Sequence, residues 1–148
     1  MAPRLTSLLE NCMRHLRYLM AARERLPKPL VAGHLADPPD ELVAVLDQFA
    51  FRFVRLQDTM GARLFRVFLV ENLKEPYEDA PLRDVLDRLE ALRLLDSAED
   101  WERIRAMRNA LAHDYPESAE EKAATLNLAI EMAGQMDAAL QRLRNVAR

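Results

Sequence analysis

The sequence predicts an all-α protein, namely an antiparallel up-and-down bundle of four to five helices that forms a single domain over residues 1–148. A length of 148 residues suits one compact domain. Half of the residues are hydrophobic and 30% are charged, which is typical of a globular protein with a packed core. Only 3 glycines are present, whereas a turn-rich β fold needs glycine at its tight turns. Helices are therefore the expected elements.

The first expected helix runs from about Leu5 to Leu26, because its apolar residues recur at intervals of three and four. Thr6 or Ser7 is its expected N-cap. The segment Pro27–Pro39 contains four of the 8 prolines and one glycine. This composition predicts a stiff connector with no element of its own.

A long second helix is expected from about Pro39 to Asn72, with Asp37 or Asp40 as its cap and a bend at Gly61. One apolar stripe repeats at intervals of four and three, which is typical of a helix packed in a bundle. Its members are Leu42, Leu46, Phe49, Phe53, Leu56, Met60, Leu64 and Val67.

A second, looser stripe lies on another face of the long helix and comprises Phe51, Val54, Phe65 and Leu69. One neighbouring helix cannot cover both stripes, so a second surface must bury this one. Two alternatives remain open, another helix of the same bundle or a second copy of the chain.

Two shorter helices are expected next. The first runs from about Pro81 to Leu95 with Asp79 as its cap. Ser97, with Asp100 three residues later, predicts a capping box for a helix from Ala98 to about Asp114.

The final expected helix begins at Ser118, which forms a capping box with Glu121, and continues almost to the C-terminus. Its apolar face is predicted from residues at three-and-four spacing. These residues are Leu126, Ile130, Ala133, Met136, Leu140 and Leu143.

Charge and cysteine content limit the classes of function. A net charge of −3 argues against a nonspecific nucleic-acid binder, so any polyanion site must be local. The single cysteine, Cys12, cannot form an intrachain disulfide, and no Cys/His spacing predicts a metal site. We therefore expect no metal and no cofactor. No secretory signal and no membrane-spanning stretch is apparent, which leads us to expect a cytoplasmic protein without membrane association.

Arg108 interrupts the apolar face of the fourth helix. Trp101, Ile104 and Leu111 share this face, and a guanidinium takes the place of an expected leucine. A buried unpaired guanidinium costs several kcal/mol. Arg108 must therefore either pair with a carboxylate, such as Asp58 or Asp47, or reach a cleft that admits an anion.

His113 lies close to Arg108 in the sequence. Asn109 and His113 are one helical turn apart, and the helix is expected to end soon afterwards, before Pro116. A histidine near a helix end is partly solvated and can act as a general base. Together, an imidazole and a guanidinium suit cleavage of RNA by its own 2′-hydroxyl, which needs a base and a fixed cation but no metal.

The motif resembles that of a known family. The string Arg108-Asn109-Ala110-Leu111-Ala112-His113-Asp114-Tyr115 is similar to the Arg-x4-His-x-Tyr signature of HEPN domains of the HepT toxin type. The resemblance extends upstream to Trp101 and to the stretch Phe49–Asp58, which looks like the long second helix of these proteins. It covers the chain from about Asp40 onward.

This resemblance implies a homodimer or higher even oligomer that acts as a metal-independent endoribonuclease on an RNA substrate. Arg108 would stabilise the transition state, His113 would act as acid or base, and Asn109 would position the phosphate. The implied partner is a nucleotidyltransferase antitoxin that transfers AMP to the motif tyrosine, here Tyr115.

Three further arginines are candidate contacts for RNA or a nucleotide, namely Arg52, Arg55 and Arg105. An equally simple interpretation is that they are solvated. Two alternatives to the nuclease stay open. One is a non-catalytic partner or substrate-binding subunit of the nucleotidyltransferase, and the other is a structural bundle in which Arg108 only pairs with Asp58.

Overall fold

The computed structural model describes residues 2–113 and 117–147, and every element in these ranges is a helix. This confirms the predicted fold class. The elements are α1 (Pro3–Arg25), α2 (Ala32–Leu35), α3 (Asp40–Thr59), η1 (Met60–Leu64), α4 (Phe65–Val67), η2 (Phe68–Asn72), α5 (Leu82–Ala91), α6 (Ala98–Ala112) and α7 (Ala119–Ala147).

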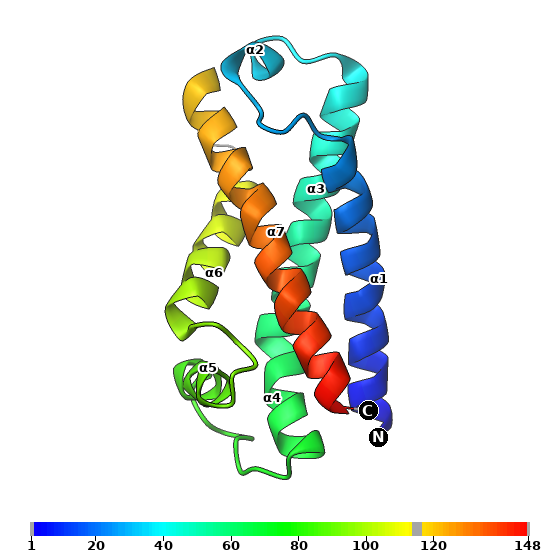
Figure 1. The fold of residues 1–148 in the computed structure, drawn as a ribbon, viewed down its shortest axis with the longest axis vertical. Coiled ribbons are helices and arrows are strands. Elements are labelled where there is room, and N and C mark those ends of the chain that lie inside the picture. Colours follow the sequence, from blue (N-terminus) through cyan, green and yellow to red (C-terminus); the bar gives the residue numbers. More distant parts are fainter. Residues whose placement is uncertain (1, 114–116, 148) are drawn as a thin grey trace.

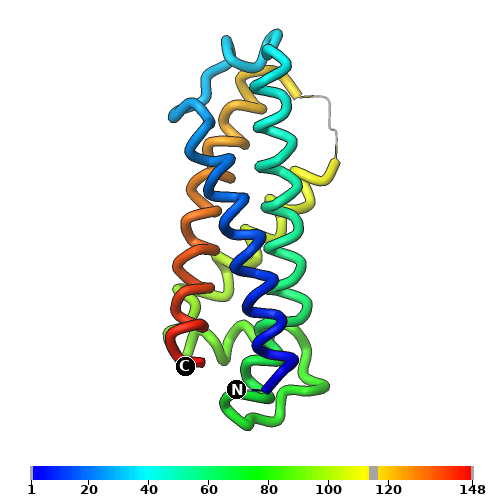
Figure 2. Tube along the Cα trace, turned by 90° about the vertical axis from the view of Figure 1, so that its right-hand side faces the viewer, coloured from blue at the N-terminus to red at the C-terminus, as the bar shows by residue number. Residues whose placement is uncertain are grey.

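The long helices alternate in direction along one axis (Figure 1). Helix α1 leads away from the end that holds both termini, the continuous run from α3 to η2 returns, α6 leads away again and α7 comes back. Helix α5 crosses this axis near the termini, and α2 lies at the opposite end. Figure 2 shows α1, α3 and α7 side by side, and α3 also packs against α6.

The main stripe of the long helix forms the centre of the core, as predicted. Phe49, Phe53, Leu56, Met60 and Leu64 are fully buried. Burial of such side chains stabilises a domain by about 1.5–3 kcal/mol each.

The second stripe is divided between the core and the surface. Phe65 and Leu69 are completely buried within the same chain, whereas Phe51 is 53% exposed. The C-terminal part of the stripe, with Phe65 and Leu69, is therefore covered by other helices of the bundle. Only the N-terminal part, with Phe51, faces solvent.

The long helix changes its hydrogen bonding at Gly61 and continues. The amide of Phe65 bonds to the carbonyl of Met60, five residues back, which defines a π-helical turn. A Cβ added to Gly61 would lie 3.3 Å from both Gln57 Nε2 and Trp101 Nε1. The missing side chain thus allows the fully packed Trp101 of α6 to approach the helix closely.

The two predicted serine caps are confirmed. The Oγ of Ser97 accepts a hydrogen bond from the amide of Asp100 at 2.9 Å, and the Oγ of Ser118 accepts one from the amide of Glu121 at 3.1 Å. These bonds satisfy amides that have no partner inside the helix.

The other predicted caps are wrong. Neither Thr6 nor Ser7 caps α1, and the expected caps Asp37, Asp40 and Asp79 do not act either. The helices begin instead at prolines. Pro3 is in the first turn of α1, and Pro39 and Pro81 occupy the N-cap positions of α3 and α5. A proline fixes φ near its helical value and has no N–H of its own to satisfy, which suits the start of a helix.

Two expected boundaries also need correction, and a third lies outside the described residues. The connector Pro27–Pro39 contains the short helix α2. Helix α5 ends at Ala91, ahead of the expected Leu95, and Arg93 follows with a φ of 61°. Helix α6 ends at Ala112, and the expected boundary at Asp114 lies outside the described residues.

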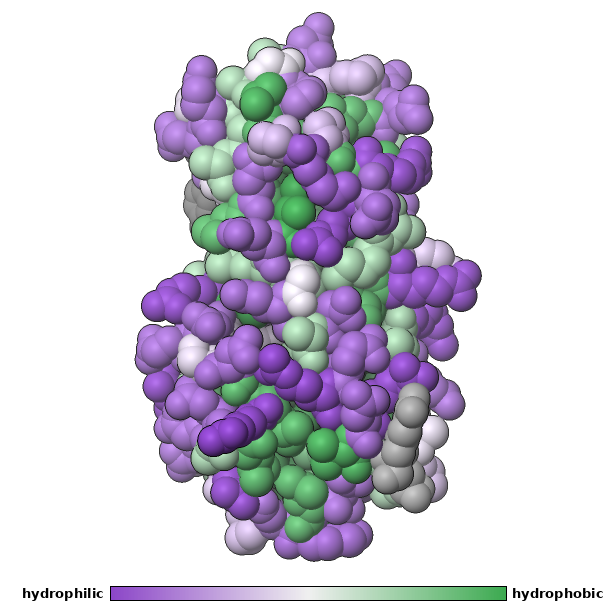
Figure 3. Space-filling view, in the orientation of Figure 1, coloured by the Kyte–Doolittle hydropathy of each residue, from purple (hydrophilic) through white to green (hydrophobic). Residues whose placement is uncertain are grey.

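The face shown in Figure 3 is largely hydrophilic, with an apolar area near the end that holds the termini. No helix within the described ranges is both long enough and apolar enough to cross a membrane.

Candidate functional site

Arg108 lies on α6 and pairs with Asp58 of α3. Its Nε donates to Asp58 Oδ1 at 2.8 Å and its Nη2 donates to Asp58 Oδ2 at 2.9 Å. The Arg108 side chain is 27% exposed and that of Asp58 is 45% exposed, so the pair lies at the solvent edge of the α3–α6 contact. The hydrogen bonds that Arg108 donates to Asp58 raise the pKa of the guanidinium, against the opposing effect of partial burial.

The pairing with Asp58 determines which N–H groups of the guanidinium stay available for another acceptor. A guanidinium carries five N–H groups in one plane, and Asp58 engages one on Nε and one on Nη2. The remaining three N–H groups can donate to another acceptor. The carboxylate thus orients the cation at the surface of the bundle.

His113 follows the last residue of α6 and has an extended backbone, with a φ of −122°. Its side chain therefore departs from the helical direction that we expected to bring it against Asn109. His113 lines a cavity of about 340 Å³ between α2, α3, α6 and α7. The acidic and basic residues that line the cavity beside it are Asp47, Glu117 and Lys122.

The structure thus places Arg108 and His113 at different positions along the contact between α3 and α6. Arg108 meets α3 at Asp58, whereas His113 lies in the cavity lined by Asp47. Among the described residues, Arg108 and Asn109 are not part of the cavity lining. His113 comes five positions after Arg108, which corresponds to a rise of about 7.5 Å along a helix.

Asn109 and Arg105 are exposed on α6, and Tyr115 lies outside the described residues. The predicted Arg52 and Arg55 are on α3, the helix that also carries Asp58. The Nη1 of Arg52 donates to His15 Nδ1 of α1 at 2.9 Å, and Arg55 lies over the ring of Phe51.

His15 is a residue that sequence reasoning missed. Burial, followed by the charges of Arg52, Arg55 and Arg14, lowers its pKa below the ordinary value of 6.5. A guanidinium can only donate, so Nδ1 of the neutral imidazole accepts. Arginines spaced three apart on both α1 and α3 were the available signal, but their convergence depends on how the two helices pair.

No group of three or more histidine, cysteine or acidic side chains within 2–113 and 117–147 could hold a metal ion. Cys12 lies in the core, where burial raises the pKa of its thiol to about 12. A thiol that remains protonated is a poor nucleophile.

Comparison with known proteins gave no match to a family model, a curated protein or a solved structure. The resemblance to HEPN domains therefore rests on the motif from Arg108 to Tyr115 and its upstream helix.

Proposed function

We propose that this chain is a HEPN-type toxin, a metal-independent endoribonuclease that a nucleotidyltransferase antitoxin inhibits by transferring AMP to Tyr115. The observation that carries the proposal is the placement of Arg108. Its guanidinium is held by Asp58 through two of its N–H groups and remains partly exposed, and His113 follows the last residue of the same helix. A fixed cation and an imidazole at a solvent-accessible edge are the groups that this reaction needs.

In the proposed reaction the 2′ oxygen of the RNA forms a bond to phosphorus while the bond from phosphorus to the 5′ oxygen breaks. His113 accepts the proton of the 2′-hydroxyl, and the leaving 5′ oxygen takes up a proton from an acid or water. The N–H groups of Arg108 that do not contact Asp58 stabilise the charge on the phosphoryl oxygens. The products carry a 2′,3′-cyclic phosphate and a 5′-hydroxyl.

The separation of Arg108 from the His113 cavity bears on the oligomeric state. The resemblance implies that two copies contribute their motifs to one cleft. We therefore propose a homodimer or higher even oligomer, in which a symmetry-related copy completes the site.

Cleavage of RNA in excess EDTA tests the proposal. We expect cleavage with cyclic phosphate ends, and we expect Arg108→Ala and His113→Ala each to reduce the rate by roughly 10²-fold or more while circular dichroism shows an intact fold. Arg142→Ala, which removes an exposed arginine paired with Asp96, is the matched control. Cleavage that requires a divalent metal, or equal rates in all variants, would overturn the mechanism.

AMP transfer to Tyr115 has its own test with a neighbouring nucleotidyltransferase and ATP. The tyrosine oxygen would bond to the α-phosphorus and pyrophosphate would leave. Mass spectrometry should find one or more AMP groups on the peptide that contains Tyr115 and none in Tyr115→Phe. Unchanged modification of the Phe variant would reject this site.

The second candidate is a non-catalytic partner or substrate-binding subunit of the nucleotidyltransferase. The bidentate Arg108–Asp58 pair favours it, because two of the N–H groups of Arg108 already donate to a carboxylate. This function predicts a stable complex with the nucleotidyltransferase but no toxicity on expression. If Arg108→Leu instead leaves every function intact and the fold equally or more stable, the structural bundle, in which Arg108 only pairs with Asp58, is favoured over both.

A further inference from the structure

The outer edge between α1 and α3 carries a cluster of four arginines around aromatic rings. Arg14, Arg17, Arg52 and Arg55 are called the arginine cluster below. Arg17 and Arg52 both lie over the ring of Tyr18, at 5.2 and 4.5 Å from its centroid. Arg52 and Arg55 lie over the ring of Phe51, at 5.3 and 6.0 Å. Arg14 is near enough to act with Arg52 and Arg55 on the charge of His15.

The arginine cluster has no acidic partner in the described part of the chain, where no carboxylate lies within 4.0 Å of any of its guanidinium nitrogens. Arginines elsewhere are paired, as Arg83 is with Asp87 and Arg108 with Asp58. In a chain with a net charge of −3 this surface is therefore a local concentration of positive charge. Such a concentration attracts a polyanion.

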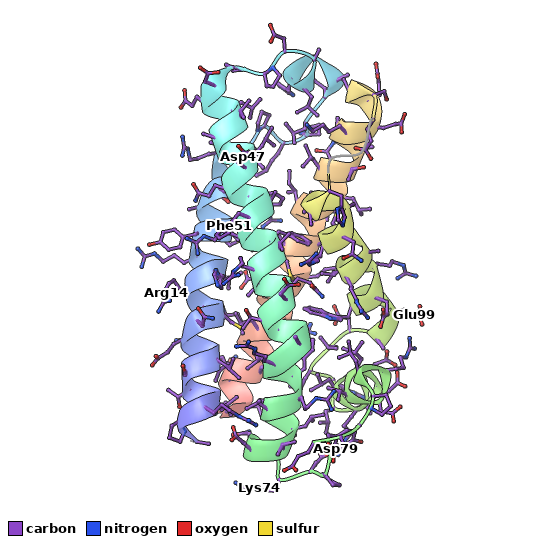
Figure 4. The ribbon with its side chains drawn as sticks, turned by 180° about the vertical axis from the view of Figure 1, so that it is seen from behind. Arg14, Asp47, Phe51, Lys74, Asp79 and Glu99 are labelled. Atoms are coloured by element: carbon purple, nitrogen blue, oxygen red, sulfur yellow. The ribbon has the colours of Figure 1, made fainter. Side chains whose placement is uncertain are left out.

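The exposed ring of Phe51 distinguishes among polyanions. Its side chain is 53% exposed beside two guanidinium groups, so a base can stack on it while phosphates contact the arginines. Single-stranded nucleic acids bind through this combination of stacking and charge. Figure 4 shows Phe51 on α3 and Arg14 on α1 along the same edge of the bundle.

The position of the arginine cluster connects it with the candidate site. Phe51 and Asp58 are seven residues apart on α3, which places them on one face about 10 Å apart along the helix. Arg55 lies between them. A nucleic-acid strand that crosses from α1 over Phe51 and Arg55 reaches the Arg108–Asp58 pair, where α3 contacts α6. The exposed Asp47 marks the acidic border of this path.

We propose that the arginine cluster, with Tyr18 and Phe51, binds the single-stranded RNA substrate and directs it toward Arg108. The inference rests on the proposed function for the identity of the RNA as substrate. An isologous contact with a second copy is disfavoured, because it would bring the four unpaired arginines of each chain close to those of the other.

Fluorescence anisotropy with a labelled single-stranded oligouridine, recorded in EDTA on a His113→Ala background, tests binding apart from cleavage. Arg17→Gln combined with Arg55→Gln should weaken binding by roughly tenfold and reduce the slope of log affinity against log salt by about 1.4. Phe51→Ala should weaken binding by about fivefold or more with an unchanged salt slope. Neither substitution removes a buried side chain.

The matched control is Arg83→Gln combined with Arg142→Gln, which removes the same charge from exposed arginines elsewhere and should leave affinity within about twofold. Equal weakening in both double variants would overturn the proposal. Binding to phosphatidylserine vesicles in place of RNA, or dissociation of an oligomer by Phe51→Ala, would assign the surface to a membrane or to a second copy and overturn it as well. RNA binding without any cleavage by the unsubstituted chain would reject the nuclease and retain this inference.

Discussion

At the scale of single residues, the surroundings of Arg108 and His15 explain the state of each charge. Arg108 is a partly exposed cation whose orientation comes from two hydrogen bonds to Asp58. His15 is a buried neutral imidazole that accepts from Arg52. A carboxylate therefore orients Arg108, whereas burial, followed by the charges of neighbouring arginines, lowers the pKa of His15.

Asp58→Asn separates orientation from stability. An asparagine keeps the shape but removes the charge that aligns Arg108, so RNA cleavage in EDTA should slow by roughly tenfold or more. The free energy of unfolding, measured in urea, should fall by only about 1 kcal/mol or less, because the pair is partly exposed. Asp96→Asn, at the exposed Arg142 pair, is the control and should change neither the cleavage rate nor the free energy of unfolding. An unchanged cleavage rate in Asp58→Asn would show that the alignment of Arg108 does not matter.

His15 should make the fold sensitive to acid. Its pKa is lowered in the folded chain, so the unfolded chain binds more protons below the ordinary value of 6.5. The free energy of unfolding should therefore decrease as the pH falls through 6.5 toward the folded pKa. His15→Gln, which retains an acceptor for Arg52, should lose part of this decrease. Urea denaturation at about pH 7.5 and about pH 5 measures it, and an identical decrease in both proteins would argue against His15 as its source.

At the scale of the elements, proline and serine positions decide where helices begin. The sequence predicted the two serine caps because a serine followed three residues later by an acidic residue is a local signal. It failed for Asp79 because Pro81 takes the N-cap position and starts α5 without a side-chain bond. The π-helical turn at Met60 and the close approach of Trp101 to Gly61 also escaped prediction, since neither has a local sequence signal.

Ser97→Ala should lower the free energy of unfolding by about 1 kcal/mol, because the amide of Asp100 loses its acceptor. Urea denaturation measures the change. Ser7→Ala, at an exposed position within α1, serves as the control and should stay within about 0.5 kcal/mol. Equal effects at both sites would mean that the cap contributes nothing specific.

Gly61→Val should destabilise the fold by roughly 1–3 kcal/mol, because the new side chain meets Trp101 and Gln57. Gly33→Ala is the comparison, since nothing lies within 4 Å of its added Cβ. That change should stabilise α2 slightly, by about 0.5 kcal/mol. Thermal unfolding followed by circular dichroism distinguishes the two, and a neutral Gly61→Val would refute the tight contact.

At the scale of the whole molecule, helix pairing brings together residues that the sequence separates. Periodicity was enough to predict an all-helical bundle and the main core stripe, because both depend on spacing within one helix. Asp58 was anticipated only as one of two partners for Arg108, since the choice depends on how α3 and α6 align. Of the arginine cluster, Arg52 and Arg55 were candidate contacts from the sequence, but their convergence with Arg14 and Arg17 was missed, because it requires the register of α1 against α3.

The central claim is that Arg108 and His113 act in one reaction on RNA. The most direct test compares initial cleavage rates in EDTA for the unsubstituted chain, Arg108→Ala, His113→Ala and the double variant. Residues that serve one chemical step lose activity non-additively, so the double variant should be about as slow as the slower single variant. Undiminished cleavage by either single variant, in protein that remains folded, would contradict the claim.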